Sequence, residues 1–188
     1  MSTTGPWVNT ISGRRFYLEN PDVNDITAGD IAWGLSMICR FNGHVRDFYS
    51  VAQHCVIVSY NVPAEHALAG LLHDAAEAFI GDGSKPLKDV LGDGGRYRKL
   101  ERKAEAAIAR TFGITFPFDP SIKAADLRTV KTEIRDLCVS TDKDYWSPGT
   151  EPLDGRIEPL GPRGARTLWK ARYKTLTGED ARSSRSPD

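Results

Sequence analysis

The sequence predicts an all-α helical bundle that carries a small β-hairpin at its N-terminus. Apolar residues recur every three or four positions through much of the chain after residue 26, which is the spacing of amphipathic helices. The chain has no internal repeat and no alternation of strands with helices, so an α/β architecture is not expected. Residues 6–19 contain two short extended pieces around Ser12-Gly13, and this pattern favours a hairpin.

The length and composition are those of one globular domain. A chain of 188 residues can bury a sizeable core, and its 40% hydrophobic and 27% charged residues are ordinary for this class. Lys plus Arg and Asp plus Glu both number 25, so the formal net charge is zero. This balance argues against binding to duplex nucleic acid, although a small anionic substrate needs only a local cluster of basic side chains.

The cysteines and the apolar runs indicate a cellular compartment. Cys39, Cys55 and Cys138 are scattered within apolar stretches, and we expect buried free thiols in a reducing cytosol. No apolar run reaches the roughly 18–20 residues of a membrane-spanning helix, and no signal peptide opens the chain. We therefore expect a cytoplasmic protein that does not associate with membranes.

The N-terminal unit, residues 1–24, is predicted to be the hairpin followed by a turn-rich bridge. Trp7, Phe16 and Leu18 are expected to pack on the helices that follow. The helical bundle is predicted to span residues 25–177. The last residues, 178–188, are charged and Ser-rich, and we expect them to be disordered.

Capping residues mark the helices of the bundle. Thr27 is expected to cap a helix that ends near Cys39, and Ser50 a helix that ends near Asn61. A third helix should begin at Pro63 and continue without a break to Gly81. The remaining elements are predicted to be a short turn at 87–91, helices at 96–112, 122–139 and 163–176, and an irregular segment at 142–162. Gly113 is expected to end the helix at 96–112.

The stretch Ala69–Ile80 places an imidazole and a carboxylate side by side, at His73-Asp74, among apolar and small residues. Burying a carboxylate in such surroundings costs several kcal/mol unless it is paired, hydrogen-bonded or bound to a metal. Glu77 follows His73 by four residues, so on a continuous helix both would project from one face. The stretch therefore predicts a functional site.

The candidate metal ligands come from three predicted helices, and they are His54, His73, Asp74 and Asp126. Mixed imidazole and carboxylate ligands suit a divalent transition metal (Mn, Fe, Co, Ni or Zn) better than Ca or Mg. Such an ion, held with open positions, activates water and polarises a phosphoryl oxygen.

The order His54 … His73-Asp74 … Asp126 resembles the H…HD…D signature of the HD-domain phosphohydrolases. The bacterial 5′-deoxynucleotidases and phage dNTP triphosphohydrolases of that family are the nearest match. The resemblance covers about residues 27–140 and includes Arg40-Phe41, Ser50-Val-Ala-Gln-His54, His73–Asp82 and Lys85-Pro-Leu-Lys88. It implies an HD-domain helical fold, a metal-dependent nucleotide hydrolase and a homodimer or higher oligomer.

The resemblance also implies roles for individual residues. The four candidate ligands would bind the metal, and Glu77 would act with Asp74 in catalysis by holding or activating the attacking water. The substrate-binding residues would be Arg40 and Phe41, with His44, Asp82, Lys85 and Lys88 around the phosphate and sugar. Two features differ from the deoxynucleotidase pattern: Phe41 stands where Trp follows the Arg, and Gly-Ser-Lys-Pro follows Asp82.

Three functions are therefore compatible with the sequence. The first is hydrolysis of nucleoside 5′-monophosphates, preferably deoxy, to nucleoside and phosphate. The second is hydrolysis of a dNTP to deoxynucleoside and triphosphate, for which Arg96 and Arg98 could extend the basic surface. The third belongs to another class, a non-catalytic nucleotide-sensing module that kept the fold; such a module is expected to lack a ligand or the glutamate.

Overall fold

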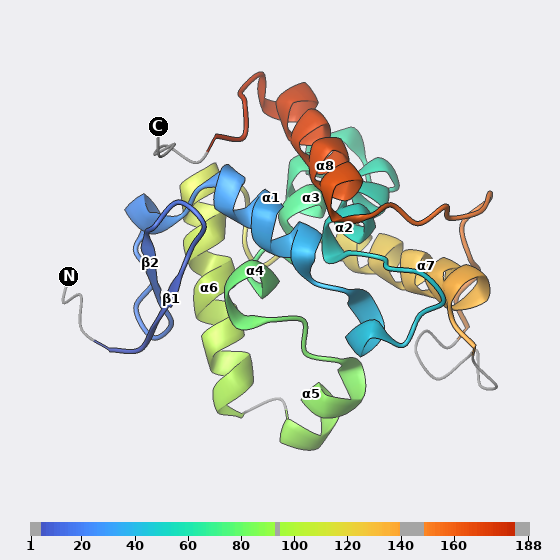
Figure 1. The fold of residues 1–188 in the computed structure, drawn as a ribbon, viewed down its shortest axis with the longest axis horizontal. Coiled ribbons are helices and arrows are strands. Elements are labelled where there is room, and N and C mark those ends of the chain that lie inside the picture. The colour runs from blue at the N-terminus through green and yellow to red at the C-terminus, as the bar shows by residue number, and fades with distance from the viewer. Residues whose placement is uncertain (1–4, 93–94, 140–148, 183–188) are drawn as a thin grey trace.

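The structure confirms the all-α fold with a two-stranded hairpin (Figure 1). It is a computed structural model that describes residues 5–92, 95–139 and 149–182. The strands β1 (Trp7–Asn9) and β2 (Arg15–Tyr17) are antiparallel, with Val8 opposite Phe16. The helices are η1 (Val23–Asp25), α1 (Ala28–Met37), η2 (Arg40–Gly43), α2 (Val51–Tyr60), η3 (Ala64–His66), α3 (Ala67–Leu72), α4 (Glu77–Ile80), α5 (Lys85–Leu91), α6 (Arg96–Phe112), α7 (Pro120–Leu137) and α8 (Pro162–Thr177).

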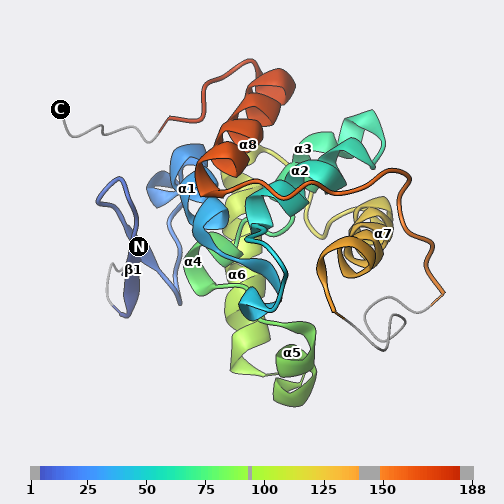
Figure 2. The ribbon, with the colours of Figure 1, turned by 45° about the vertical axis from the view of Figure 1, so that its right-hand side comes forward.

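The helices α1, α2, α3 and α8 pack on one another and form the centre of the molecule (Figures 1 and 2). The hairpin lies at one end of this group, and α7 packs on α2 at the other end. The helix α5 projects from the rest of the chain and contacts α6. The site described below therefore lies where α2, the segment between α3 and α4, and α7 come together.

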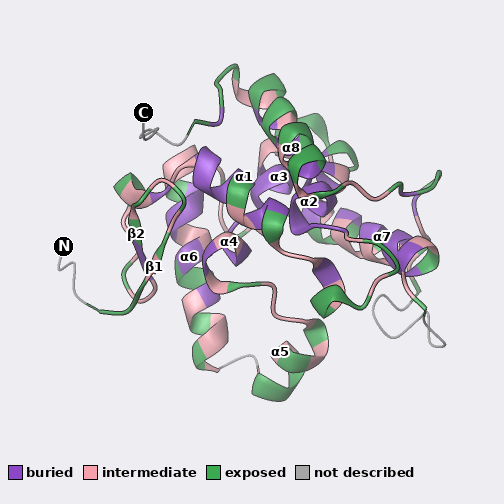
Figure 3. Cartoon of the chain, in the orientation of Figure 1, coloured by how far each residue is buried: buried purple, intermediate pink, exposed green. Residues whose placement is uncertain are grey.

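The main core is formed by the apolar faces of these central helices, and the buried segments gather at the centre of Figure 3. Leu35, Leu71 and Ile108 are almost fully buried. Trp169 of α8 is also fully buried and stacks on Tyr173 at 5.6 Å between ring centroids. The C-terminal helix therefore completes the core through this face.

The predicted caps form at Thr27 and Ser50, and Asp30, which is bonded to Thr27, also anchors the hairpin. Thr27 Oγ1 accepts a hydrogen bond from the Asp30 backbone N–H, and Ser50 Oγ accepts one from Gln53 N–H. The Asp30 carboxylate accepts in turn from the backbone N–H and the hydroxyl of Ser12, at 3.0 and 2.8 Å. Gly113 ends α6 in the left-handed conformation, as expected.

The helices α1 and α4 approach closely at Gly34. A Cβ atom at this position would lie 2.9 Å from Ala78 Cβ and 3.0 Å from the Ala78 carbonyl oxygen. Real Cβ atoms do not make such short contacts, so the packing of α4 on α1 requires glycine here. This contact fixes α4, which begins at Glu77.

Several expectations need correction. Trp7 is 47% exposed and contacts Tyr17 and Arg15 of the hairpin instead of the helices. The predicted helix 63–81 is interrupted after Leu72, as described below. Of the predicted tail 178–188, the structure describes the first five residues, and Ala181 is buried in the main core.

Two further expectations are confirmed for the described residues. The cysteines Cys39, Cys55 and Cys138 are free as expected, but only Cys55 is buried, whereas Cys39 and Cys138 are partly exposed. The region 149–161 contains no helix or strand, whereas residues 142–148 of the predicted irregular segment lie outside the described residues. Among the described helices, none has both the length and the apolar character needed to cross a bilayer.

Candidate metal centre

His54 lies in the first turns of α2 and is fully buried. Its Nδ1 atom is 2.7 Å from Oε1 of Glu133, on α7. Burial alone would raise the pKa of Glu133, but Arg40 and His54 lower it below its usual value, so the carboxylate is ionised and accepts the hydrogen bond. The proton of neutral His54 is therefore on Nδ1, and Nε2 carries a lone pair.

His73 and Asp74 lie in a tight turn between α3 and α4. Over this segment backbone N–H groups bond three residues back, from Ala75 to Leu72 and from Glu77 to Asp74, both at 3.0 Å. This is the 3-10 pattern, in which residues i and i+3 share a face. Glu77 therefore aligns with Asp74, and not with His73 as a continuous α-helix would require.

The imidazole of His73 is oriented by the backbone. Its Nδ1 atom is 2.8 Å from the Gly70 carbonyl oxygen, which can only accept a hydrogen bond. Nδ1 must therefore carry a proton, and Nε2 of neutral His73 also has a free lone pair. In an uninterrupted helix the same carbonyl would accept from the Asp74 N–H, so this side-chain bond accompanies the break in the helix.

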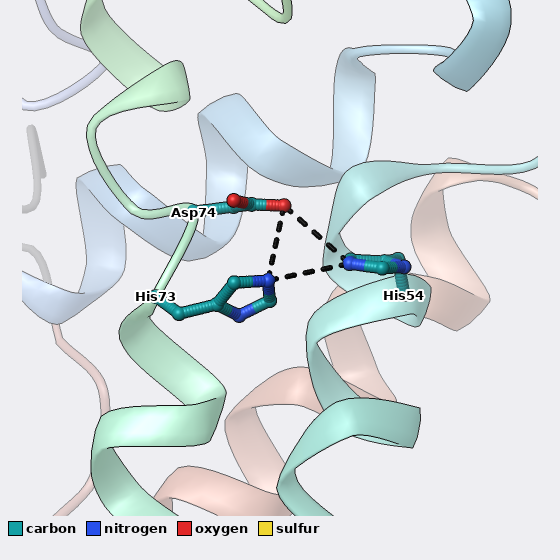
Figure 4. Close-up of side chains that lie close together, drawn as sticks. All are labelled: His54, His73 and Asp74. Carbon is teal, nitrogen blue, oxygen red and sulfur yellow. Dashed lines mark hydrogen bonds and ion pairs between the residues drawn. The ribbon is translucent and has the colours of Figure 1, made fainter. Parts of the chain in front are cut away.

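Two imidazole Nε2 atoms and one carboxylate oxygen meet at a single point (Figure 4). Nε2 of His54 and Nε2 of His73 are 3.3 Å apart, and Oδ2 of Asp74 lies 3.3 Å from the latter and 3.5 Å from the former. Asp126 joins from α7, with Oδ1 3.4 Å from His54 Nε2. The structure thus brings together all four residues that the sequence singled out as ligands.

The arrangement attracts positive charge. Burial lowers the pKa of His73, but Asp74 more than offsets this and raises it well above its usual value. Burial and Arg40 lower the pKa of His54, whereas Glu133 and Asp126 raise it, with a net increase. Burial would raise the pKa of Asp74 and Asp126, yet the two histidines hold both well below the usual range.

A cation explains the geometry of the two histidines. Two Nε2 lone pairs 3.3 Å apart repel unless a proton or a metal ion lies between them. In the metal-free protein protons can take this place, because a protonated Nε2 of His73 donates to Asp74 and a protonated Nε2 of His54 donates to Asp126. Two imidazoles with two carboxylates form a donor set that fits a divalent transition metal, and each Nδ1 has the partner that metal-binding histidines usually have.

A pocket of about 530 Å³ opens beside this cluster. Predicted site residues line it from the cluster outward, namely His73, Asp74, Asp126, Glu77, Arg40, Phe41, Asp82, Lys88 and Lys85. One wall is apolar and comes from α7 and the loop before it, with Phe118, Ile122, Leu127 and Val130. The pocket therefore offers a charged end at the cluster and an apolar side farther along.

Glu77 is buried at 5% exposure, and its Oε2 atom makes no hydrogen bond. Burial raises the pKa of Glu77 well above its usual value, and Asp74 and Asp82 add to this effect. Lys88 opposes it, with Nζ 3.7 Å from Glu77 Oε1. A buried carboxyl group with an unused oxygen in a pocket is suited to proton transfer.

Arg40 enters the pocket from a strained turn. The two residues after it, Phe41 and Asn42, have φ of 54° and 53°, which is uncommon for residues other than glycine and costs roughly 1–3 kcal/mol each. The Arg40 guanidinium donates from Nε to Glu133 Oε2 at 3.1 Å, and Nη1 is 3.7 Å from Asp74 Oδ2. Arg40 therefore stands at the edge of the candidate metal centre.

The other predicted substrate-binding residues differ in whether they line the pocket and in what they are paired with. His44 is exposed and is not among the residues that line the pocket, so its role in substrate binding stays a prediction. Lys85 lines the outer pocket but pairs with Asp89 at 2.6 Å. Asp82 lines the pocket with its pKa raised by burial and by Asp74. Arg96 is bound to Glu19 outside the pocket, whereas Arg98 lines it.

Sequence reasoning missed several acidic residues of the site. Glu133 is fully buried and contacts both His54 and Arg40. Glu101 lines the pocket and binds Lys88 at 2.7 Å and Arg98 at 3.1 Å, while Glu105 lies near them. One available signal was the position of Glu133, seven residues after Asp126 and therefore on the same face of α7.

The fold and the cluster define an all-helical protein with a buried His–His–Asp centre at the end of a pocket. The chain is 39% identical over 176 residues to the uncharacterized protein YfdR of Escherichia coli, a match that covers 91% of this chain and 96% of the relative. It is 32% identical over 190 residues to an uncharacterized protein of Rhodobacter capsulatus, covering 90% and 95%. The chain therefore belongs to the family of YfdR. No protein-family model matches it.

Proposed function

We propose that the protein is a metal-dependent phosphohydrolase of the HD-domain type that acts on nucleotides. The observation that carries this proposal is the pair of Nε2 atoms 3.3 Å apart, each belonging to a histidine whose Nδ1 is already bound. Asp74 Oδ2 lies within 3.5 Å of both nitrogens, and Asp126 Oδ1 lies 3.4 Å from the nitrogen of His54. Two imidazoles and two carboxylates gathered from three separate segments are a donor set that suits a divalent transition metal.

A divalent Mn, Fe, Co, Ni or Zn ion would be held by His54, His73, Asp74 and Asp126. When bound, such an ion supplies Lewis-acid activation of water and neutralises charge on a phosphoryl group. The positive charge would also lower the raised pKa of Glu77, and this favours the ionised carboxylate that proton acceptance requires.

The protein side chains perform the remaining tasks. Glu77 accepts a proton from the attacking water, and Lys88 keeps that carboxylate from becoming too basic. Arg40 binds a phosphoryl oxygen through its terminal nitrogens, because its Nε is already bound to Glu133. The apolar wall of Phe118, Ile122, Leu127 and Val130 suits the face of a base or sugar.

The charge of the pocket favours a monophosphate over a triphosphate. Its lining contains five Asp and three Glu, against two Arg and three Lys. Lys85, Lys123 and Lys88 are each within 2.7 Å of a carboxylate. A triphosphate tail would meet this negative surface, whereas a single phosphoryl group needs only the metal and Arg40. Nucleoside 5′-monophosphates are therefore the leading substrates, and dNTPs the alternative.

The test is a substrate panel with the purified full-length chain and added Mn²⁺ or Co²⁺. Deoxynucleoside and nucleoside monophosphates and dNTPs are incubated, and the products are separated by chromatography. Orthophosphate released from monophosphates supports the proposal, and intact triphosphate released from dNTPs supports the alternative. A metal-loaded protein that releases neither, or a His73→Ala variant with full turnover, contradicts the assigned site. A folded protein that binds nucleotide without turnover indicates a sensing module.

The proposal retains two expectations about the setting of the protein. Nucleotide substrates agree with a cytoplasmic location. A homodimer or higher oligomer is expected, and light scattering of the purified chain would contradict this expectation if it gave the mass of a single 20.7 kDa chain at all concentrations.

A further inference from the structure

Glu133 is a fully buried carboxylate on α7, and each of its oxygens has a different partner. Oε1 is 2.7 Å from His54 Nδ1, and Oε2 is 3.1 Å from Arg40 Nε. The partners are 79 and 93 residues away in sequence, on α2 and in the strained turn before it. One carboxylate therefore connects a candidate metal ligand with the residue assigned to the phosphoryl group.

We infer that Glu133 is a positioning residue that sets the tautomer of His54 and the orientation of Arg40 at the same time. This inference rests on the proposed function and names the residue that couples its metal site to its phosphate site. The contact with His54 is made at the nitrogen that points away from the cluster, and this leaves Nε2 free to bind a metal. The contact with Arg40 uses Nε alone, and Nη1 is 3.7 Å from Asp74 Oδ2, beyond hydrogen-bond distance, so the terminal nitrogens can still bind an anion.

A purely structural ion pair with Arg40 would explain the position of Oε2 of Glu133. It would not explain why Oε1 is bound to His54. A carboxylate that only neutralised Arg40 could bind it with both oxygens in the two-pronged geometry that arginine favours. Glu133 instead gives one oxygen to each partner. Because each oxygen serves a different partner, a change at Glu133 should alter at least one of the two sites.

Replacement of Glu133 by Gln separates the two roles without a change of shape. An amide has one accepting oxygen and one donating nitrogen, and it cannot accept from both N–H groups. If its oxygen faces His54, its NH2 group faces the Nε–H of Arg40, and the two donors repel each other. If its nitrogen faces His54, the imidazole must carry its proton on Nε2, and the metal-binding lone pair is lost. In either orientation one of the two sites is damaged.

The experiment titrates the full-length apo protein with Co²⁺ and follows the visible absorption bands of the bound ion. Orthophosphate is then titrated into the Co²⁺-loaded protein and detected through the change in the same bands. The variants are E133Q, Arg40→Met and the double variant. Thr132→Val is the matched control, because Thr132 is buried on the same helix but bonds only Leu153 N–H and the Arg128 carbonyl.

The inference predicts that E133Q weakens Co²⁺ or orthophosphate binding by about 10–100-fold, the usual effect of losing a partner that orients a ligand. Arg40→Met should weaken orthophosphate binding but not Co²⁺ binding, because Arg40 gives the metal no ligand atom and the loss of its positive charge beside Asp74 favours a cation. In the Arg40→Met background, E133Q should no longer affect orthophosphate. The control T132V should bind both probes as wild type does, even if its urea midpoint is lower.

Unchanged Co²⁺ spectra and unchanged affinities for both probes in E133Q would overturn the role of Glu133 and leave the proposed function intact. A wild-type protein that binds no Co²⁺ would overturn the metal centre itself and this inference with it. If E133Q does not fold, Glu133→Asp keeps the charge but shortens the side chain. Binding of both probes by the Asp variant at wild-type strength would equally refute the bridging role.

Discussion

Replacement of Glu105 by Gln should stabilise the metal-free protein at alkaline pH and have no effect at acidic pH. Burial, with Glu101 and Asp74 nearby, raises the pKa of Glu105 from 4.5 to about 7. Below pH 4.5 the folded and unfolded chains both hold the proton, so the shift costs nothing. Between pH 4.5 and about 7 the unfolded chain loses this proton while the folded chain keeps it, so stability falls across that interval and the full cost is present above pH 7.

The size of the effect follows from the two pKa values. The interval from 4.5 to about 7, at about 1.36 kcal/mol per pH unit, gives an upper limit of roughly 3 kcal/mol. Glu105 is only partly buried, and solvent screening reduces the expected gain of Glu105→Gln at pH 8 to about 1–2 kcal/mol. Urea unfolding of both proteins in EDTA, at pH 5 and pH 8, measures this difference directly.

An exposed glutamate outside the pocket provides the control for Glu105→Gln. Glu65→Gln changes an exposed residue outside the pocket and should show the same difference from wild type at both pH values. Mn²⁺ should reduce the advantage of Glu105→Gln, since a cation in the cluster counteracts the negative potential that raises this pKa. Equal effects of Glu105→Gln at pH 5 and pH 8 would show that the pKa of Glu105 is not raised in the folded protein.

Three further predictions concern residues around the site. Lys88→Met removes the positive charge 3.7 Å from Glu77, so the pKa of Glu77 should rise. The acidic limb of the pH–rate profile should then move to higher pH, with roughly a tenfold loss of turnover at pH 7. An acidic limb that does not move contradicts the role of Glu77. Gly34→Ala should destabilise the protein by about 1–3 kcal/mol in urea unfolding because of the contact with Ala78. Gly161→Ala, with open space around its Cβ, should cost under about 1 kcal/mol. Equal urea midpoints for the two variants would refute the packing argument at Gly34. His44→Ala should leave metal binding and turnover unchanged, because His44 does not line the pocket. A tenfold loss of turnover would show that His44 contacts the substrate.

The fold was largely predictable because local signals determine most of the helices. Thr27 and Ser50 form the caps expected of them, and Gly113 ends α6 where its sequence position indicated. The break between α3 and α4 was not predictable, since Ala-rich sequence favours a continuous helix. The tight turn is accompanied by a side-chain bond from His73 to the Gly70 carbonyl, which helix propensity does not describe.

The site was predictable where the residue type is unusual for its surroundings. A carboxylate and an imidazole in an apolar stretch identified His73 and Asp74, and the structure brings His54 and Asp126 to them. Glu133 escaped notice because a glutamate in an amphipathic helix ordinarily faces solvent. Its burial follows from partners 79 and 93 residues away, and such pairings cannot be read from local pattern.

The most direct test of the metal centre is the anomalous scattering of crystals grown with Co²⁺. The account predicts one strong anomalous peak per chain, bounded by Nε2 of His54, Nε2 of His73 and Oδ2 of Asp74, with Asp126 beside it. The same crystals of a folded His73→Ala variant should lose that peak. A saturating Co²⁺ soak of wild-type crystals that left these atoms without a peak would contradict the central claim.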